Sequence, residues 1–287
     1  MYMESIRLQR GDGGWPMSVF VTFEKKPFYG FTYLPPADVG GRPGFKTVIS
    51  KVRDVWKTEK SEILKGAEAI TKGINDSAQM PNLEAVPLTM ELYHNAFAKL
   101  KNNYDNANGG FGEAPKFPSA ATIQFLLRYA YFYQNAEAKE MAEKTLLSMA
   151  KGGLNDQVGG GFHRYSVDAK WMVPHFEKML SDNALLAPVY CDAFLFTRND
   201  FFGRIAKDTF NYVIQNMQSP EGGYYSSEDA DSDGEEGKFY LWSLGEIESI
   251  LTEEEAALAK EYYQIKSNGN FSSRETYHQN KNILMGV

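Results

Sequence analysis

The chain has one cysteine, no long apolar run and no excess of basic residues. Because the single cysteine, Cys191, excludes an internal disulfide framework, we expect a protein of a reducing compartment, the cytoplasm. No apolar run reaches the about eighteen residues that a membrane-spanning helix needs, so we expect no membrane association. The formal net charge of −7 at pH 7 also argues against nucleic-acid binding, which depends on neutralising phosphates.

Three glycine pairs are each followed by an aromatic residue, at 109–111, 160–162 and 222–224. Regular self-similarity of this kind is typical of repeat architectures. Paired glycines also allow a positive φ and a close approach of the backbone to other groups. Because each pair lies between helical segments, the sequence predicts the helical hairpins of an α/α toroid, with equivalent loops gathered at one end.

The first forty residues have a different pattern. The β-rich runs 18–23 and 28–33, joined by the turn 24–27, predict a hairpin. Apolar residues at helical spacing predict one helix from Pro43 to about Gly73 that packs on this hairpin. Residues 75–87 are rich in Asn, Asp, Ser and Pro and predict a linker.

Beyond the linker the periodicity predicts helices almost throughout. We expect side-chain caps at Thr89, Ser119 and Asp200, another helix start at Pro174 or Asp182, and a helix end at Gly152. The remaining elements are a strand-like stretch at 238–242, a Glu-rich helix from Leu244 to about Tyr263 and a poorly patterned tail after Ser267.

A toroid of this type needs about six helical hairpins, and the pattern supplies roughly three. We therefore expect an incomplete toroid. Its uncovered apolar helix faces would favour self-association of the chain.

Several long and distinctive motifs lie at 13–20, 26–36, 116–118, 156–168, 174–180 and 228–232. Together they resemble one family, the thioredoxin-like proteins related to spermatogenesis-associated protein 20. The resemblance implies a mainly α fold in two parts. Residues 1–78 would be the C-terminal part of a thioredoxin-like domain. Residues 79–287 would be part of an α/α six-hairpin toroid similar to N-acylglucosamine 2-epimerases and six-hairpin glycosidases.

The chain departs from this family at its start, where the Cys-x-x-Cys motif is absent. Redox activity is therefore not assigned to it, and we expect both domains to be incomplete. The resemblance also implies that Trp15–Pro16 forms the cis-proline turn of a thioredoxin-like domain, since cis bonds are essentially confined to X-Pro.

Two histidines and two carboxylates predict a catalytic group: His163, His175, Glu177 and Asp182. A sugar isomerase or epimerase moves a proton next to a carbonyl, and histidine suits that role near neutral pH. His175 and Asp182 are seven residues apart and would share a face if one helix contained both. The alternative is that His175 begins a helix and simply hydrogen-bonds a neighbouring loop.

Polar and aromatic residues near the glycine loops predict substrate contacts. A glycosidase would need two of their carboxylates to face each other. Trp171 and Tyr165 could stack on a sugar ring or cover the core. We expect the histidines and Glu177 to share one concave pocket with Glu228 or Asp229. The predicted substrate-binding residues are Glu113, Lys116, Asp156, Tyr165, Trp171, Glu228 and Asp229.

Residues 229–234 resemble the first half of a calcium loop, but Tyr240 stands where a bidentate Glu is required. We therefore expect no metal site and no cofactor. Cys191 lies among apolar helix residues and is expected to be a buried structural thiol. The sequence thus favours a carbohydrate-binding or carbohydrate-acting toroid. The alternative is an interaction protein, non-catalytic or redox-linked, whose toroid only binds a partner.

Overall fold

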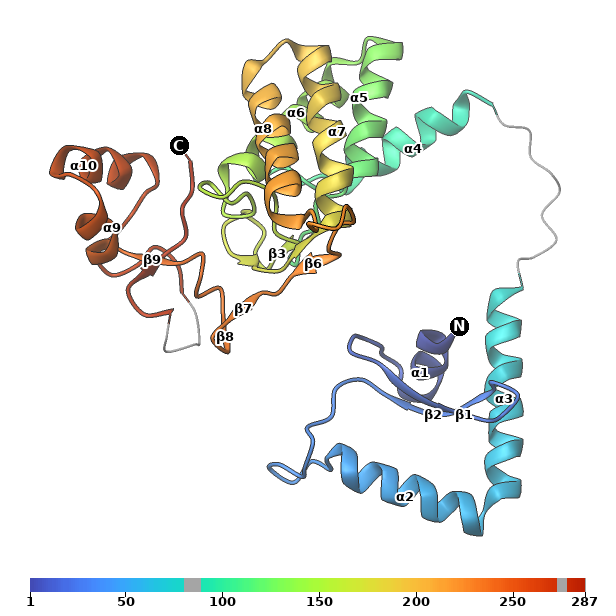
Figure 1. Cartoon of the computed structure of the whole chain (residues 1–287). Helices are drawn as coiled ribbons and strands as arrows, with labels where there is room; N and C mark the ends of the chain where they lie inside the picture. Colours follow the sequence, from blue (N-terminus) through green and yellow to red (C-terminus); the bar gives the residue numbers. More distant parts are fainter. Residues whose placement is uncertain (80–88, 273–277, 287) are drawn as a thin grey trace. The chain divides into compact units, whose positions relative to one another are not determined.

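The computed structural model describes residues 1–79, 89–272 and 278–286 and divides the chain into two compact units, Met1–Pro87 and Leu88–Val287 (Figure 1). Within the predicted linker, residues 75–87, the structure instead shows the end of a helix at residues 75–78. Residues 80–87 lie outside the described part of the chain. None of the described helices is long and apolar enough to cross a lipid bilayer.

The first unit is a two-stranded antiparallel hairpin with three helices. Strand β1 (Ser18–Val21) pairs with β2 (Pro27–Phe31) in the register Ser18↔Phe31, as the β-rich runs predict. The Trp15–Pro16 peptide is cis, which confirms that prediction. The helices are α1 (Tyr2–Arg10), α2 (Phe45–Thr58) and α3 (Lys60–Ala78).

Helices α1 and α3 pack on the hairpin and bury Ile6, Phe31 and Ala67. Gly30 permits this approach, because a Cβ there would lie 2.7 Å from Ile6 Cγ1. The sequence pattern missed α1. The predicted single helix to Gly73 is also wrong: it breaks at Glu59, inside the stretch 57–61, which has no apolar side chain to hold it against the hairpin.

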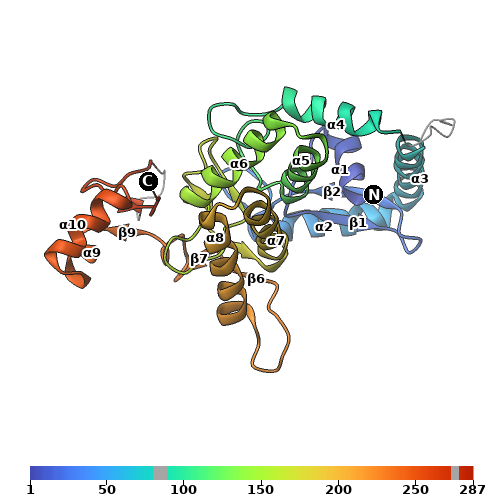
Figure 2. The same cartoon turned by 90° about the horizontal axis from the view of Figure 1, so that it is seen from above.

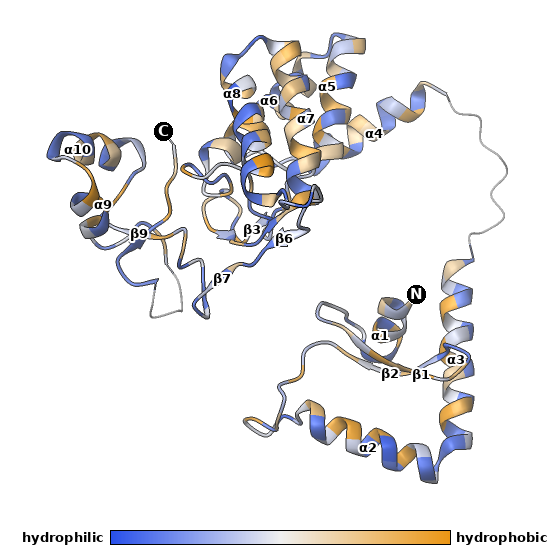
Figure 3. Cartoon of the chain, viewed as in Figure 1, coloured by the Kyte–Doolittle hydropathy of each residue, from blue (hydrophilic) through white to orange (hydrophobic). Residues whose placement is uncertain are grey.

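Seven α-helices are described in the second unit, and four of them, α5 to α8, lie side by side (Figures 1 and 2). Apolar colour dominates α5 and α7 (Figure 3), which supply much of the core, including Leu126, Leu186 and Tyr190. The helices are α4 (Glu91–Asn102), α5 (Ala120–Tyr133), α6 (Ala136–Lys151), α7 (Leu180–Thr197), α8 (Asp200–Tyr212, continued by the π-helix Val213–Met217), α9 (Leu244–Ile250) and α10 (Glu253–Tyr262).

Several predicted helix ends need correction. Helix α7 begins at Leu180, so Asp182 lies in its first turn, and Pro174 belongs to a strand instead. Asn199, rather than Asp200, caps α8 by accepting a hydrogen bond from the amide of Phe201. Ser119 stands at the N-cap of α5 without a side-chain hydrogen bond, and α4 starts after Met90 without a cap from Thr89. Gly152 ends α6 as predicted.

The C-terminal segment also differs from its prediction. The Glu-rich helix is two helices, α9 and α10, because Ser243 and Thr252 each open a separate capping box. The strand-like stretch contributes only Trp242 to β9 (Trp242–Ser243). This strand pairs with β10 (Lys281–Asn282) inside the tail that sequence patterning left without structure.

Short strand pairs join the loops at one end of the helices (Figure 1). Lys116 bridges to Ser166, β3 (Tyr165–Ser166) pairs with β4 (Pro174–His175), and β5 (Lys178–Met179) pairs with β6 (Ser227–Glu228). The acidic segment forms a further hairpin of β7 (Asp231–Ser232) and β8 (Glu235–Glu236). The three glycine loops therefore lie at the same end, as the repeat predicts.

The glycine pairs give a direct test of this packing. Gly161 has a φ of 74°, and a Cβ there would lie 2.3 Å from the ring of Tyr212. Gly222 has a φ of 94° but nothing within 4 Å. We expect Gly222→Ala to lower the free energy of unfolding by about 1–2 kcal/mol through backbone strain. Gly161→Ala should lower it by several kcal/mol, because overpacking adds to the strain. If urea denaturation showed equal losses of unfolding free energy for the two variants, this packing would be contradicted.

Candidate functional site

The first two glycine pairs form the same turn, whereas the third forms a shorter one, in which Ser219 N donates to Gly223 O at 2.7 Å and Gly222 N donates to Ser219 O at 2.9 Å. In the first, Asp105 N donates to Gly110 O at 2.9 Å and Gly109 N donates to Asp105 O at 2.8 Å. In the second, the corresponding bonds join Asp156 to Gly161 and Gly160, both at 3.0 Å. The residues before and after each turn form a bridge: Tyr104↔Phe111, Asn155↔Phe162 and Gln218↔Tyr224.

A buried lysine closes the first turn. Lys116 is 1% exposed, and its ammonium group donates to Asp105 Oδ2 at 2.5 Å and to Gly109 O and Ala169 O at 2.9 Å. Burial alone would raise the pKa of Asp105, but the hydrogen bond from Lys116 helps to hold it well below its ordinary value. All three ammonium protons have oxygen partners, so this pair has a structural role.

Lys178 takes the same place in the second turn. It is 1% exposed and donates to Asp156 Oδ2 at 2.7 Å and to Gly160 O at 2.9 Å. Its ammonium group also lies 4.3 Å from the ring centroid of Tyr212 and 4.9 Å from that of Tyr240. Burial raises the pKa of Asp156 and the Lys178 charge lowers it, with a net decrease. Lys116 and Lys178 are therefore equivalent parts of a repeated motif.

The third turn lacks this closure. Ser219 stands in the place of the aspartates, and its hydroxyl accepts a hydrogen bond from Glu221 N at 3.2 Å. In the described part of the chain, no lysine bonds to this turn. The repeated aspartate was a signal in the sequence: Asp105 and Asp156 each precede their glycine pair by four residues. Of the predicted substrate contacts, Lys116 is buried in its ion pair, whereas Asp156 is only partly buried and is bonded to Lys178.

His163 is almost completely buried. Its Nδ1 lies 2.9 Å from the carbonyl oxygen of Phe176, which can only accept, so Nδ1 carries the proton. Burial and the nearby Lys178 charge lower the pKa of His163 to about 3, although Asp156 opposes this. The ring is thus neutral across the physiological range, with a lone pair on Nε2.

This histidine predicts how stability depends on pH. Its folded pKa of about 3 lies below the ordinary value of about 6.5, so the unfolded chain binds the proton first as the pH falls. The contribution is complete above about pH 6.5 and decreases toward pH 3, by about 1.4 kcal/mol per pH unit in between. We expect His163→Gln to reduce the slope of unfolding free energy between pH 6 and 5, measured by urea denaturation.

A slope that is the same with and without His163 would contradict its burial as a neutral ring.

His175 belongs to a separate polar cluster. Its Nδ1 lies 2.7 Å from Glu236 Oε1, its Nε2 lies 3.7 Å from Glu177 Oε2, and its ring stacks on Tyr165 at 5.1 Å. Arg164 donates to Glu177 Oε2 at 2.8 Å. The cluster thus contains the predicted catalytic residues His175 and Glu177, together with Tyr165, which was predicted to line the wall of the site.

Asp182 lies near this cluster, in the first turn of α7. Burial raises its pKa, the charge of Arg164 lowers it, and that of Glu177 raises it again, with a net increase. A carboxyl group that keeps its proton to a higher pH can act as a proton donor. The catalytic assignment of His175, Glu177 and Asp182 stays a prediction.

Other predicted site residues are not brought together. Glu228 accepts a hydrogen bond from the Tyr212 hydroxyl at 2.8 Å, whereas His175 contacts Glu236. Glu113 and Asp229 are exposed. Trp171 is fully buried, and a Cβ on Gly110 would lie 2.5 Å from its ring, so Trp171 covers the core instead of stacking on a ligand. The expected single pocket is therefore two clusters at one end of the helices.

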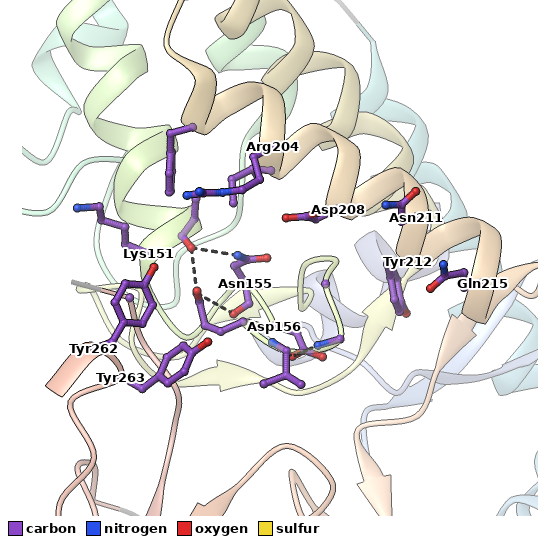
Figure 4. A pocket seen from close by; sticks show the side chains of 18 residues that line it. Lys151, Asn155, Asp156, Arg204, Asp208, Asn211, Tyr212, Gln215, Tyr262 and Tyr263 are labelled. Atoms are coloured by element: carbon purple, nitrogen blue, oxygen red, sulfur yellow. Dashed lines mark hydrogen bonds between the residues drawn. The ribbon is translucent and has the colours of Figure 1, made fainter. Parts of the chain in front are cut away.

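A polar cleft of about 360 Å³ lies beside the second glycine turn (Figure 4). Helix α8 and its π-helical continuation form one wall, where the side chains of Arg204, Asp208, Asn211 and Gln215 follow a helical spacing. The turn 155–160 forms the floor. Tyr262 and Tyr263 lie across from α8 at the end of α10. Asp156 is the one residue of this lining that the sequence predicts as a site residue.

The polar side chains of the α8 wall are available to a ligand. Within residues 1–79, 89–272 and 278–286, none of Asp208, Asn211 and Gln215 has a side-chain hydrogen bond or ion pair to the protein. Arg204 lies over the Phe201 ring, with its guanidinium carbon 5.1 Å from the centroid. Charges of both signs and two amides suit a neutral ligand with many hydroxyl groups.

The described residues hold no cluster of His, Cys, Asp or Glu able to bind a metal ion. The acidic hairpin makes a tight turn through Asp233 and Gly234, both with positive φ, in place of a calcium loop. Cys191 is partly buried and free. Its burial and the neighbouring Asp192 raise its pKa, which disfavours a thiolate nucleophile.

Comparison with known proteins relates the chain to named relatives. Spermatogenesis-associated protein 20 of Rattus norvegicus is 40% identical over 265 residues, covering 88% of this chain and 34% of that protein. An uncharacterized protein of Caenorhabditis elegans is 34% identical, covering 99% of this chain and 41% of its own length. The family model described as a protein of unknown function, DUF255, and labelled as thioredoxin-like, matches residues 1–75.

Over most of its length the chain is thus similar to spermatogenesis-associated protein 20-like proteins. It spans about a third of the length of the rat relative. The predicted resemblance and the thioredoxin-like N-terminal segment are thereby confirmed, and the structure shows the mainly helical fold.

Two solved structures are similar to part of this chain. Cellobiose 2-epimerase from Spirochaeta thermophila matches with a TM-score of 0.42 and 18% identity, covering 50% of this chain and 42% of that one. Cellobiose 2-epimerase from Bacillus thermoamylovorans matches with a TM-score of 0.44 and 12% identity, covering 61% of this chain and 55% of that one.

Proposed function

We propose that the second unit binds a carbohydrate or a similar polyol in the cleft between α8 and the end of α10. The observation that carries this proposal is the row of unpaired polar side chains on α8 opposite two tyrosines. Hydroxyl groups both donate and accept, so they match a wall that offers a guanidinium group, a carboxylate and amides. The apolar face of a sugar ring is complementary to the aromatic faces of Tyr262 and Tyr263.

The proposal is tested by thermal shift with a panel of cellobiose, N-acetylglucosamine, mannose and sorbitol on the full chain. A ligand at about a hundred times its Kd should add about 2.7 kcal/mol of stability. Arg204→Ala and Asp208→Ala should each weaken binding about tenfold, the effect of losing about 1.4 kcal/mol of hydrogen bonding to a charged group.

Lys207→Ala is the matched control, because Lys207 is exposed on α8 and does not line the cleft. It should leave the affinity unchanged. If no sugar in the panel binds, or if all three variants behave alike, the proposal is wrong. That result would favour an interaction protein, for which the open groove of about 430 Å³ between α5 and α7, with exposed Phe132 and Leu195, is the supporting feature.

Proton transfer is assigned in this proposal to the His175 cluster, which requires a sugar that extends beyond the cleft, because none of His175, Glu177 and Glu236 lines it. The half-buried ring reaches solvent and is flanked by Glu177 and Glu236, whereas the buried ring of His163 stays neutral. We expect His175→Gln to abolish epimerisation of a sugar that binds, followed by NMR, while the melting temperature changes by only a few degrees. A large loss of stability with binding intact would show that His175 is a structural residue.

A further inference from the structure

A second cavity borders the same turn as the cleft, and its walls are largely apolar. It has a volume of about 440 Å³ and shares residues 155–159 with the polar cleft. Its other walls differ: Phe176, Phe239, Tyr240 and Trp242 supply aromatic rings, and Ile283 and Leu284 supply aliphatic groups. Its size falls in the range of small-molecule sites.

Several polar side chains that line the cavity are already committed to the protein. Asn155 Nδ2 donates to Ala150 O at 3.0 Å, and Gln157 Nε2 donates to Ala150 O and Gly152 O. Asp156 Oδ2 accepts from Lys178. These groups shape the wall and contribute little to recognition of a ligand.

His163 is the exception. Its Nδ1 proton is used by Phe176 O, and in the described residues no hydrogen bond reaches its Nε2. Every fully buried side-chain nitrogen or oxygen in that same part of the chain has a hydrogen-bond partner. Because Nε2 has none, it is not fully enclosed and borders open space. Because His163 lines this cavity, a ring that is almost wholly buried offers a lone pair to it.

We propose that this cavity binds a neutral aromatic molecule that carries a ring-bound N–H or O–H donor, such as an indole or a phenol, with the donor bonded to His163 Nε2. The aromatic walls favour a planar ring through stacked and edge contacts. The unprotonated Nε2 selects a donor and gives no bond to a ligand that only accepts. A cation is disfavoured because the Lys178 ammonium group lies 4.9 Å from the Tyr240 ring centroid. This ligand class is independent of the proposed sugar.

The probe pair that separates recognition from simple apolar binding is indole and 1-methylindole. The two rings have similar apolar surfaces, but 1-methylindole has no N–H donor. We expect indole to bind the full chain saturably at millimolar concentration or below, by ligand-observed NMR. 1-Methylindole should bind about fivefold more weakly, the ratio expected for one net hydrogen bond.

Val158 provides a variant that blocks the cavity without touching the core. It lines the cavity and is 68% exposed, so Val158→Trp should fill the rim and abolish indole binding. Val167→Trp is the matched control, since Val167 is 48% exposed and lies outside the lining. Equal affinity for the two indoles, binding that survives Val158→Trp, or no binding of indole would each overturn the proposal.

Discussion

The second glycine turn is held closed by one buried ion pair, Lys178 with Asp156. The ammonium group gains a carboxylate and a backbone carbonyl, and the aromatic rings of Tyr212 and Tyr240 lie over it. Removing one partner of such a pair would leave an uncompensated buried charge, which proteins tolerate poorly. The ion pair therefore helps to hold the turn in its tight left-handed glycine conformation.

Both candidate binding sites depend on this turn. Residues 155–159 contribute to the polar cleft and to the aromatic cavity, so the position of one short segment determines two ligand surfaces. The same charge pair acts on His163, because Lys178 lowers its pKa while Asp156 raises it. The ion pair thus positions the segment that both sites share, while burial is the main cause of the lowered pKa of His163 in the aromatic cavity.

Sequence patterns predicted those features of the fold that depend on the conformation of a short segment of the chain. The glycine pairs, the hairpin and the apolar periodicity of α5 and α7 follow from backbone freedom and amphipathicity, and the structure shows each of them. Burial of Lys116 and Trp171 was not predictable in this way, because it arises from packing between segments distant in the sequence. The cleft was missed for the same reason: its walls come from α6, α8 and α10.

The two histidines show why a motif alone does not assign chemistry. They lie near each other in the sequence among the same carboxylates, yet one is enclosed by Phe176 and Tyr240 and the other is flanked by Glu177 and Glu236. A ring with a pKa of about 3 stays neutral at neutral pH, so Nδ1 of His163 donates to Phe176 O and only Nε2 is left as an acceptor. The two proposals accordingly assign proton transfer to the ring that reaches solvent and recognition of a donor to the ring that does not.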